Sequence, residues 1–449
     1  MDILGGIKRM VTKAAIKILD IRPANDSKIT IYEPLSHAGN VTRNRLWYRG
    51  EPSELDQFFK ASASKNDIVA QSRFWAATPS ENSSIRKMHS GLPAMIVDRI
   101  SDMIVADIDK IEVKNEGVNS IWEEISKDNK FYELIQDAIT KTLIDGDGAF
   151  KITGDSTISE YPILEFFSGD RVDYVFNRGR LTNILFYTSY KKGSKEYVLE
   201  ENYGKKFIKY KLYLDGKEVP ITSIEETSRF EDATYTGDYI MAIPLKFFKS
   251  PKWDNRGKSI FDTKSDSFDS LDEVISQWID AFRDGRVNKY IPDCLIPRNP
   301  ETGELIKPNP FDNRYIATGS DAGEQARNEI KTTQAEINYE AFSESYANAL
   351  DLCLQGIISP ATLGIDLKKT DNAEAQREKE KTTLYTRGKI IDVLNEVIPQ
   401  LINLTLKVNN ELSGKTLVDN EVSIEFGEYA SPSFDSVVEI VGKAKSYGI

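Results

Sequence analysis

Residues 265–286 read SDSFDSLDEVISQWIDAFRDGR, a run in which large apolar residues recur three and four positions apart. That spacing places them on one side of a helix that packs against similar helices. The residues of this apolar seam are Phe268, Leu271, Ile275, Trp278 and Phe282. The pattern therefore predicts a helix over residues 265–286 with a single packing face.

Residues 335–357, AEINYEAFSESYANALDLCLQGI, repeat the design. The predicted seam of this second helix begins with Tyr339, Phe342 and Tyr346. A proline-rich, strand-like segment separates the two helices. At a rise of about 1.5 Å per residue, each helix would be roughly 30 to 35 Å long, so together they can form a stalk with a small module at its tip. An ordinary helical hairpin inserted in a domain is the plainer interpretation.

Carboxylates dominate the positions outside the two seams. The first helix has only two basic residues, Arg283 and Arg286, near its C-terminal end, and the second has none. This composition predicts a strongly negative face on the hairpin. The carboxylates that we assign to this face are Asp266, Asp269, Asp272, Glu273, Asp280 and Asp284 in the first helix and Glu336, Glu340 and Glu344 in the second, which also contains Asp351.

The remaining patterns predict an α+β chain. Helices are expected over most of residues 44–113 and as one helix over residues 119–143. Short β-rich runs over residues 149–249 predict an antiparallel meander, with a hairpin turn at Asp215 and Gly216. Short strands are expected over residues 289–297 and 314–318. A long helix is expected from Ala373, with a kink at Pro399.

Composition limits the possible functions. The chain has 449 residues and a net charge of −12, which argues against gripping nucleic acid over a wide surface, because such binding needs many Lys and Arg contacts to phosphate. The negative net charge is compatible with a protein along which nucleic acid slides without being held. Two cysteines, Cys294 and Cys353, are too few for a disulfide framework.

Motifs for catalysis are missing from the sequence. Two histidines, His37 and His89, are too few for most metal or triad chemistry. Gly257-Lys258-Ser259 and Gly414-Lys415-Thr416 lack the leading glycine of a phosphate-binding loop. We therefore expect a protein that is not an enzyme and that has no metal or cofactor.

Several segments resemble a known family, the portal proteins of long-tailed double-stranded DNA bacteriophages. The most specific run is GIISPATLGID at residues 356–366, which continues to NAEAQ at residues 372–376. NRLWYRG at residues 44–50 and MHSGLP at residues 88–93 are similar to recurrent family segments. The resemblance covers about residues 44–426.

The resemblance implies a portal-like subunit with an α/β wing, a two-helix stem hairpin, a small α/β clip, a tunnel loop and a long kinked helix. The chain ends at Ile449, soon after Pro432, where many relatives continue into a longer crown. The implied parts are an N-terminal arm or helix (1–46), the wing (47–264), stem helix 1 (265–286), the clip (287–334), stem helix 2 (335–358), the tunnel loop (359–372), and a kinked wing helix with a short or truncated crown (373–449).

The resemblance also implies a function. Such proteins form rings, typically of twelve subunits, at one capsid vertex of the virion, and double-stranded DNA is packaged and ejected through the channel. Assembly would occur in the host bacterial cytoplasm, without membrane. The implied partners are the terminase large subunit, a head-completion or connector protein, and the major capsid and scaffolding proteins.

Particular residues receive roles from this implied function. The stem carboxylates would line the channel and repel DNA, so that the duplex slides. Lys368 and Lys369, with Gly364 adding flexibility beside them, would touch the DNA backbone from the tunnel loop. Arg298, Lys307 and Arg314 would be docking charges on the clip.

Two other classes of protein stay open from the residues alone. A monomeric adaptor, or another structural protein of the head, could use the acidic hairpin to bind a basic partner. A nuclease that holds magnesium with carboxylates would need few histidines. The first predicts a protein that never forms rings, and the second predicts metal-dependent activity.

Overall fold

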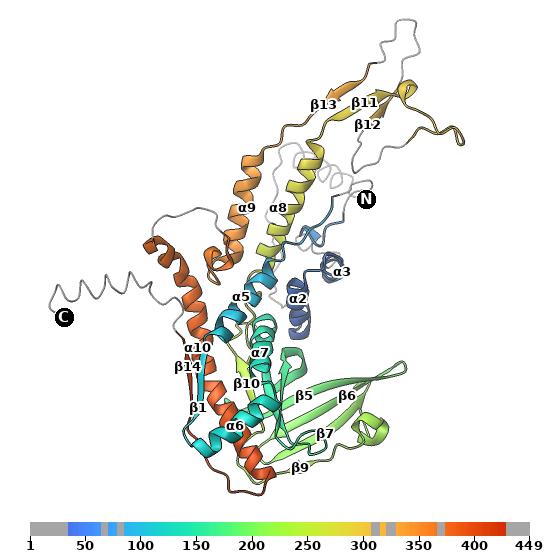
Figure 1. Ribbon diagram of the computed structural model, residues 1–449. Coiled ribbons are helices and arrows are strands. Elements are labelled where there is room, and N and C mark those ends of the chain that lie inside the picture. The colour runs from blue at the N-terminus through green and yellow to red at the C-terminus, as the bar shows by residue number, and fades with distance from the viewer. Residues whose placement is uncertain are drawn as a thin grey trace, which may run out of the picture. The chain divides into compact units, whose positions relative to one another are not determined.

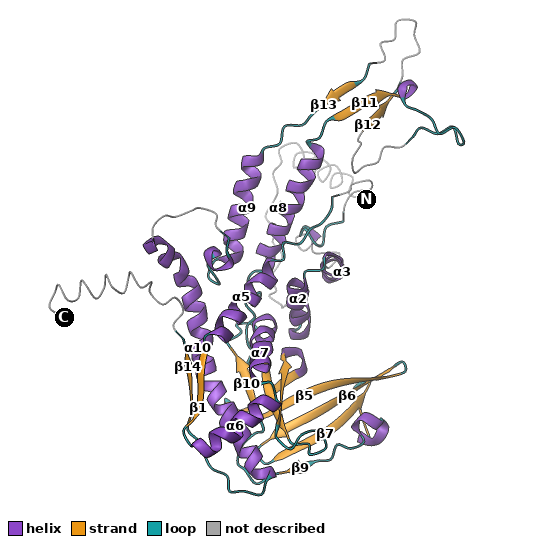
Figure 2. Cartoon of the chain, in the orientation of Figure 1, coloured by secondary structure: helices purple, strands orange, loops and turns teal. Residues whose placement is uncertain are grey.

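The computed structural model describes residues 35–63, 71–78, 85–306, 315–319, 329–365 and 373–427. The chain divides into two units, residues 1–36 and 37–449, and every element below belongs to the second unit. Figures 1 and 2 show these elements along the chain and by type. Among the residues that the structure describes, none of the helices has the length and apolar character that crossing a membrane requires.

Helices α2 (His37–Arg49), α3 (Pro52–Ser62) and α5 (Leu92–Ala106) form the first part of the core. Trp47 of α2 is fully buried, and its ring lies 5.5 Å from that of Phe59 in α3. Gly91 takes a left-handed conformation, with φ of 70°, immediately before α5. These helices agree with the helical structure expected over most of residues 44–113.

The single helix predicted over residues 119–143 is wrong, because the chain forms two helices, α6 (Glu116–Asp128) and α7 (Phe131–Asp145). Lys130 has a φ of 47°, a left-handed conformation that ends a helix. The Asn129 side chain fixes the break by accepting from the Leu164 N–H (2.7 Å) and donating to the Pro162 carbonyl (2.9 Å). Partners more than thirty residues away therefore decide where α6 ends.

A three-stranded antiparallel sheet has the order β10 (Ala242–Lys246), β2 (Asp147–Thr153) and β3 (Ile163–Ser168). Asp147, at the start of β2, is fully buried. It accepts a hydrogen bond from the Gly257 N–H (2.7 Å) and lies 3.4 Å from Arg256. These contacts join the sheet to the turn that leads into the hairpin.

The predicted meander is confirmed only in part: its middle runs form a six-stranded sheet, with strands in sequence order from β4 to β8 and β9 paired to β7, whereas its first and last runs belong to the separate sheet of β2, β3 and β10. Asp215 and Gly216 have φ angles of 50° and 75°, as a tight hairpin turn with two left-handed residues requires. The strands are β4 (Val172–Asn177), β5 (Arg180–Lys192), β6 (Lys195–Gly204), β7 (Phe207–Leu214), β8 (Lys217–Val219) and β9 (Ala233–Thr234), with 3₁₀ turns η1 (Gly169–Arg171), η2 (Ile221–Ser223) and η3 (Glu225–Thr227).

The predicted helical hairpin is present as α8 (Ser265–Asp284) and α9 (Tyr339–Leu354), which lie side by side in Figure 1. The second helix begins at Tyr339 instead of Ala335, because the side chain of Asn338 accepts from the Ala341 N–H and caps it. Between the helices, β11 (Asn288–Pro292) pairs with β12 (Tyr315–Thr318) and with β13 (Lys331–Thr333). The 3₁₀ turn η4 (Asp293–Leu295) follows β11.

The last described elements are the 3₁₀ turn η5 (Pro360–Leu363), the long helix α10 (Ala373–Leu412) and strand β14 (Val422–Phe426). Pro399 lies inside α10. Strand β14 pairs with β1 (Ile108–Val113) in a separate two-stranded sheet. The sequence patterns did not predict this pairing, since its strands are more than 300 residues apart.

Candidate functional site on the helical hairpin

An aromatic cluster closes the seam between α8 and α9. The ring of Trp278 is parallel to that of Phe342, with 2° between the planes and 6.3 Å between centroids. Tyr346 and Phe282 lie 6.3 and 6.1 Å from the same indole. Within this chain, these seam residues therefore pack around Trp278.

The N-terminal end of α8 packs into the core instead of against α9. Phe268 and Leu271 are buried, and the Phe268 ring lies 5.6 Å from both Trp47 and Phe261. The Trp47 indole N–H donates to the Ser265 hydroxyl at 3.1 Å. Helix α8 thus has a buried N-terminal half and a C-terminal half that contacts α9.

Two of the predicted surface carboxylates are buried instead. Asp272 is fully buried and accepts hydrogen bonds from the Trp75 indole N–H (3.1 Å) and the Ser90 N–H (2.8 Å), while His89 Nδ1 lies 2.7 Å away. Asp269 is 7% exposed and accepts from the N–H groups of Phe74 and Trp75. The expectation that they belong to an exposed acidic face is wrong.

The physical reason is that the buried carboxylates satisfy backbone and ring donors for which the described residues offer no other partner. Burial raises the pKa of Asp269, and the two N–H groups that it accepts from oppose that rise. Ser276, one turn after Asp272, accepts from the Met88 N–H at 2.9 Å. These three residues of α8 hold both described ends of the segment over residues 71–90.

Sequence reasoning missed this anchor, although a signal was present. His89 belongs to the MHSGLP segment, which carried part of the family resemblance. A histidine and a serine in such a segment, with carboxylates on an otherwise separate helix, are candidates for one hydrogen-bonded cluster. Only the tertiary structure selects which carboxylates of the helix take part.

The other seven carboxylates leave an acidic surface on the hairpin. Glu336, Glu340, Glu344 and Asp284 are exposed, while Glu273 and Asp280 are half-buried. Asp266 is exposed and forms an ion pair with Arg73 at 2.8 Å. Burial, and secondarily Asp269, raises the pKa of Glu273. Most of the exposed negative charge thus lies toward the end of the hairpin that carries β11 to β13.

Two seam residues remain exposed within this single chain. Tyr339 is 63% exposed and Phe282 is 52% exposed. Apolar side chains around the tip are similarly exposed, namely those of Val287, Leu295, Ile306, Ile316 and Ile330. Contiguous exposed apolar surface is typical of protein interfaces.

The predicted clip charges are only partly described. Arg298 donates to the carbonyl of Gly303 at 3.0 Å, across a turn of the tip. Lys307 and Arg314 lie outside the described residues. Their predicted docking role therefore stays a prediction.

The predicted tunnel loop (359–372) is described only over its first part, residues 359–365. Gly364 ends η5 with a φ of 72°, and Lys368 and Lys369 lie outside the described residues. The Thr362 hydroxyl lies 2.9 Å from that of Thr383 in α10, and its carbonyl accepts from Arg99 Nε at 3.0 Å. The start of the loop is thus tied to α10 and α5.

The described residues of the hairpin bring together carboxylates and aromatic side chains. Within the described ranges, no three His, Cys, Asp or Glu residues are grouped to hold a metal ion. The His89 side chain is 3% exposed and lies between Asp272 and the ring of Trp47, 5.7 Å away, where it packs as part of the anchor.

Among the comparisons with known proteins, the one with solved structures gives matches. No protein-family model matches the chain, and no curated protein matches it. A solved structure of the neck of a native GTA particle, computed with C12 symmetry, is similar with a TM-score of 0.39 and 15% identity, over 78% of this chain and 85% of that chain. The neck of an empty GTA particle, computed with C6 symmetry, is similar with a TM-score of 0.37 and 14% identity, over 80% of this chain and 85% of that chain. A likeness at this level assigns no function.

Proposed function

We propose that this chain is a subunit of a phage portal ring, through which double-stranded DNA is packaged into the head and later ejected. The observation that carries the proposal is the hairpin of α8 and α9. It is closed by the stack of Trp278 on Phe342, and its exposed acidic residues lie toward its far end. The segments that resemble portal proteins, including residues 356–366, agree with this assignment.

The mechanism follows from charge. In a ring, the carboxylates of many hairpins would surround the duplex, and like charge would prevent the ion pairs that hold DNA through counterion release. Glu336, Glu340 and Glu344 are the best candidates for this acidic wall, because all three are exposed. Asp269 and Asp272 are excluded, since both are buried and bonded to the segment over residues 71–90.

Ring formation needs surface that is apolar and free in a single chain. The exposed Phe282 and Tyr339 on the hairpin, with Leu352 of α9 (54% exposed), would provide part of it. In a ring, they would pack against the next subunit. Lys368 and Lys369 would contact the DNA backbone from the tunnel loop, and the clip would dock the terminase and then the head-completion protein.

The test is the mass and shape of the purified chain, by light scattering and negative-stain electron microscopy. We expect rings of about twelve subunits with a central hole, the closed symmetry of a head-to-tail interface. A chain that stays monomeric even with its capsid and scaffolding proteins would instead support the adaptor. Metal-dependent DNA cleavage, abolished by changing a specific carboxylate pair, would support the nuclease.

A further inference from the structure

A pocket of about 760 Å³ lies between the six-stranded sheet and the sheet of β10, β2 and β3, on a part of the chain that the proposed function does not use. Strands β2 and β3 line it on one side, and β5, β6 and β7 line it on the other. Its volume is within the range of about 300 to 1,000 Å³ that is usual for ligand sites. The lining residues that carry the argument are Lys151, Glu165, Phe167, Tyr190, Glu201 and Tyr210.

Strand pairing brings these side chains together. Lys151 of β2 is directly opposite Glu165 of β3, and Phe167 lies two residues farther along β3, on the same face. Glu201 and Tyr210 are directly opposite each other in β6 and β7, so they also share a face. The lining therefore comes from the facing sides of two sheets.

A cluster of three charges lies in the buried part of the pocket. The Lys151 ammonium lies 2.9 Å from Glu165 and 3.1 Å from Glu201. The side chains of Lys151 and Glu201 are 7% and 5% exposed, whereas that of Glu165 is 43% exposed. Because Glu201 alone balances Lys151, the half-exposed Glu165 leaves the cluster with one surplus negative charge.

Three tyrosines around the cluster show the same sign of charge. Burial, and then Glu201, raises the pKa of Tyr190, of Tyr203 and of Tyr210, the last to about 12. Basic residues oppose the rise at Tyr190, but the charged groups that act most on Tyr203 and Tyr210 are carboxylates. A negative surrounding raises the pKa of a phenol, because the phenol ionises to an anion. The part of the pocket beside Glu201 is therefore electronegative.

Aromatic rings in this pocket already hold cations over their faces. The Lys151 ammonium lies 4.5 Å from the centre of the Phe167 ring, and the Arg171 guanidinium lies 4.6 Å from it. On the opposite wall, Tyr210 stacks with Phe230 at 5.1 Å. A ring face attracts a cation, and the attraction is stronger where water is excluded. Surplus negative charge and aromatic rings together suit a positively charged ligand.

The less buried part of the lining does not change this sign. Arg171 and Arg229 line it together with Asp155 and Glu231, so basic and acidic residues are equal in number there. None of these four residues is buried. The surplus charge of the whole lining is therefore that of the buried cluster.

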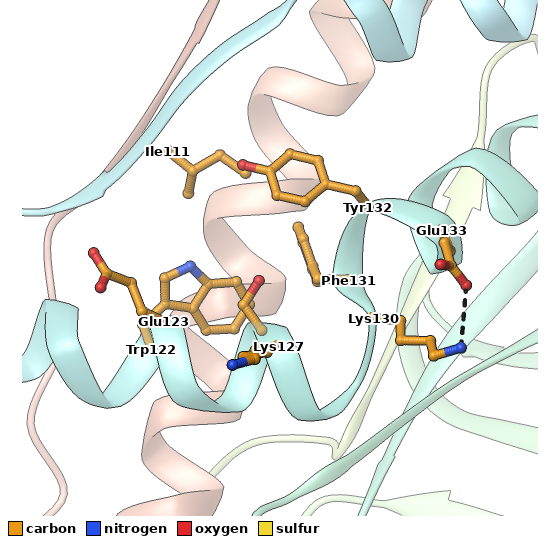
Figure 3. Close-up of a pocket in the computed structure, with 9 residues that line it drawn as sticks. Ile111, Trp122, Glu123, Lys127, Lys130, Phe131, Tyr132 and Glu133 are labelled. Atoms are coloured by element: carbon orange, nitrogen blue, oxygen red, sulfur yellow. Dashed lines mark ion pairs between the residues drawn. The ribbon is translucent and has the colours of Figure 1, made fainter.

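A smaller pocket gives a contrast. It has a volume of about 470 Å³ and lies between β1, α6 and α7, and Figure 3 shows the ion pair of Lys130 with Glu133 beside it. Its other charged residues are Lys127 and Glu123, so basic and acidic residues are equal in number. The lining of the smaller pocket does not select the charge of a ligand, whereas that of the larger pocket does.

We propose that the larger pocket binds an organic cation, an alkylammonium or a guanidinium group. Glu165 would be its counter-ion, and Tyr190 and Tyr210 would provide rings beside it. Lysine and arginine side chains of a partner protein carry such a group, and free polyamines carry it too. The proposal goes beyond the proposed function and does not depend on ring formation, because the pocket lies within one chain.

The experiment is saturation-transfer NMR on the full chain, with n-butylammonium as the probe and butan-1-ol as its uncharged counterpart. We expect saturation of the ammonium probe and none of the alcohol. Glu165→Gln should weaken binding of the probe by about fivefold, because it removes the surplus charge. The fold should be kept, since Glu201 still pairs with Lys151.

The matched control is Glu231→Gln, which makes the same change of net charge in the less buried part of the lining. It should weaken binding by about twofold or less. Equal losses in Glu165→Gln and Glu231→Gln would overturn the proposal, and so would butan-1-ol that binds as well as n-butylammonium.

Two further probes identify the source of the cation. A short peptide with one lysine, N-acetyl-glycyl-lysyl-glycinamide, represents a partner protein, and spermidine represents a free amine. Tighter binding of the peptide would support a side chain of a partner, and tighter binding of spermidine would support a free polyamine. In either case, the binding should weaken in Glu165→Gln, and binding that is unchanged in this variant would contradict the assigned site.

Discussion

Asp272 and Asp280 belong to the same helix and have opposite surroundings. Asp272 is fully buried beside His89 and accepts from Trp75 and Ser90, whereas Asp280 is half-buried and lies farther along α8. A buried carboxylate with several donors stabilises its neighbours, because its removal leaves those donors without a partner in a place that water does not reach.

Replacing Asp272 by alanine is expected to destabilise the chain by about 3 to 5 kcal/mol, since the Trp75 indole, His89 and the Ser90 N–H would remain buried without a partner. The measurement is the free energy of unfolding in urea. Asp280→Ala is the control, with an expected change of about 0.5 kcal/mol or less. Equal losses of unfolding free energy in the two variants would contradict the role of Asp272 as a buried anchor.

Asp147 gives a prediction about pH. Its burial raises its pKa from 3.8 to about 6, against the opposing effect of Arg256. Between these values the folded chain keeps a proton that the unfolded chain has lost, so this carboxyl makes the free energy of unfolding fall as pH rises from about 4 to 6. The full difference corresponds to about 3 kcal/mol.

His37 acts in the opposite direction over the same interval. Burial, and then Arg256, lowers its pKa from 6.5 to about 4, so the unfolded chain binds the proton that the folded chain does not. Its contribution to stability therefore rises with pH, and the two residues partly cancel in the original chain.

The check is to measure unfolding of Asp147→Asn and of the original chain at several values between pH 4 and 6. The variant should gain stability with pH relative to the original chain, because the opposing contribution of the Asp147 carboxyl is removed while the His37 contribution stays. Parallel curves would show that the Asp147 carboxyl has no raised pKa.

At the scale of elements, the hairpin depends on one aromatic stack. Trp278→Ala should cost about 3 to 5 kcal/mol of local stability, because the indole contacts Phe342 and Tyr346 across the seam. Hydrogen exchange of the α9 amides measures the opening, which should become faster. Phe282→Ala, which removes a ring that is 52% exposed, should change exchange much less. Equal exchange in both variants would contradict the role of the stack.

Two glycines in neighbouring elements predict opposite effects of the same substitution. Gly364 ends η5 at a φ of 72°, so Gly364→Ala should destabilise by about 1 kcal/mol or more. Gly388 lies inside α10, and a Cβ added there meets nothing within 4 Å. Gly388→Ala should therefore stabilise by about 0.5 to 1 kcal/mol. Thermal unfolding of both variants tests the pair, and changes of the same sign would refute it.

At the scale of the whole molecule, the proposed channel depends on repulsion. Changing Glu336, Glu340 and Glu344 to lysine should leave the fold intact, because all three are exposed. The variant ring should hold double-stranded DNA in a salt-dependent way, with an affinity that falls steeply as salt increases. The original ring should bind it weakly.

The matched control reverses three exposed carboxylates outside the hairpin, Glu218, Glu225 and Glu226. It has the same net charge as the stem variant but leaves the proposed wall unchanged. A filter-binding titration at two salt concentrations compares the three proteins. If the control retains DNA as strongly as the stem variant, net charge alone explains the effect, and the acidic wall loses its support.

The sequence by itself determined the local elements. Seam spacing predicted α8 and α9, short β-rich runs predicted the strands of the meander from β4 to β8, and Asp215 with Gly216 predicted its hairpin turn. These features depend on neighbours within a few positions, because helix and strand periods repeat over short distances. These patterns predicted the ends of elements less well. The spacing of the seam predicted that the second helix begins at Ala335, whereas the cap at Asn338 makes α9 begin at Tyr339.

Only the tertiary structure decided which carboxylates are surface and which are anchors. Asp272 meets Trp75 and Ser90, which are 197 and 182 residues away along the chain. Asn129 similarly ends α6 through distant partners, and β14 pairs with β1 across most of the chain. Burial and long-range pairing depend on how distant segments meet in space, and the periodicity of a single segment carries no information about its distant partner.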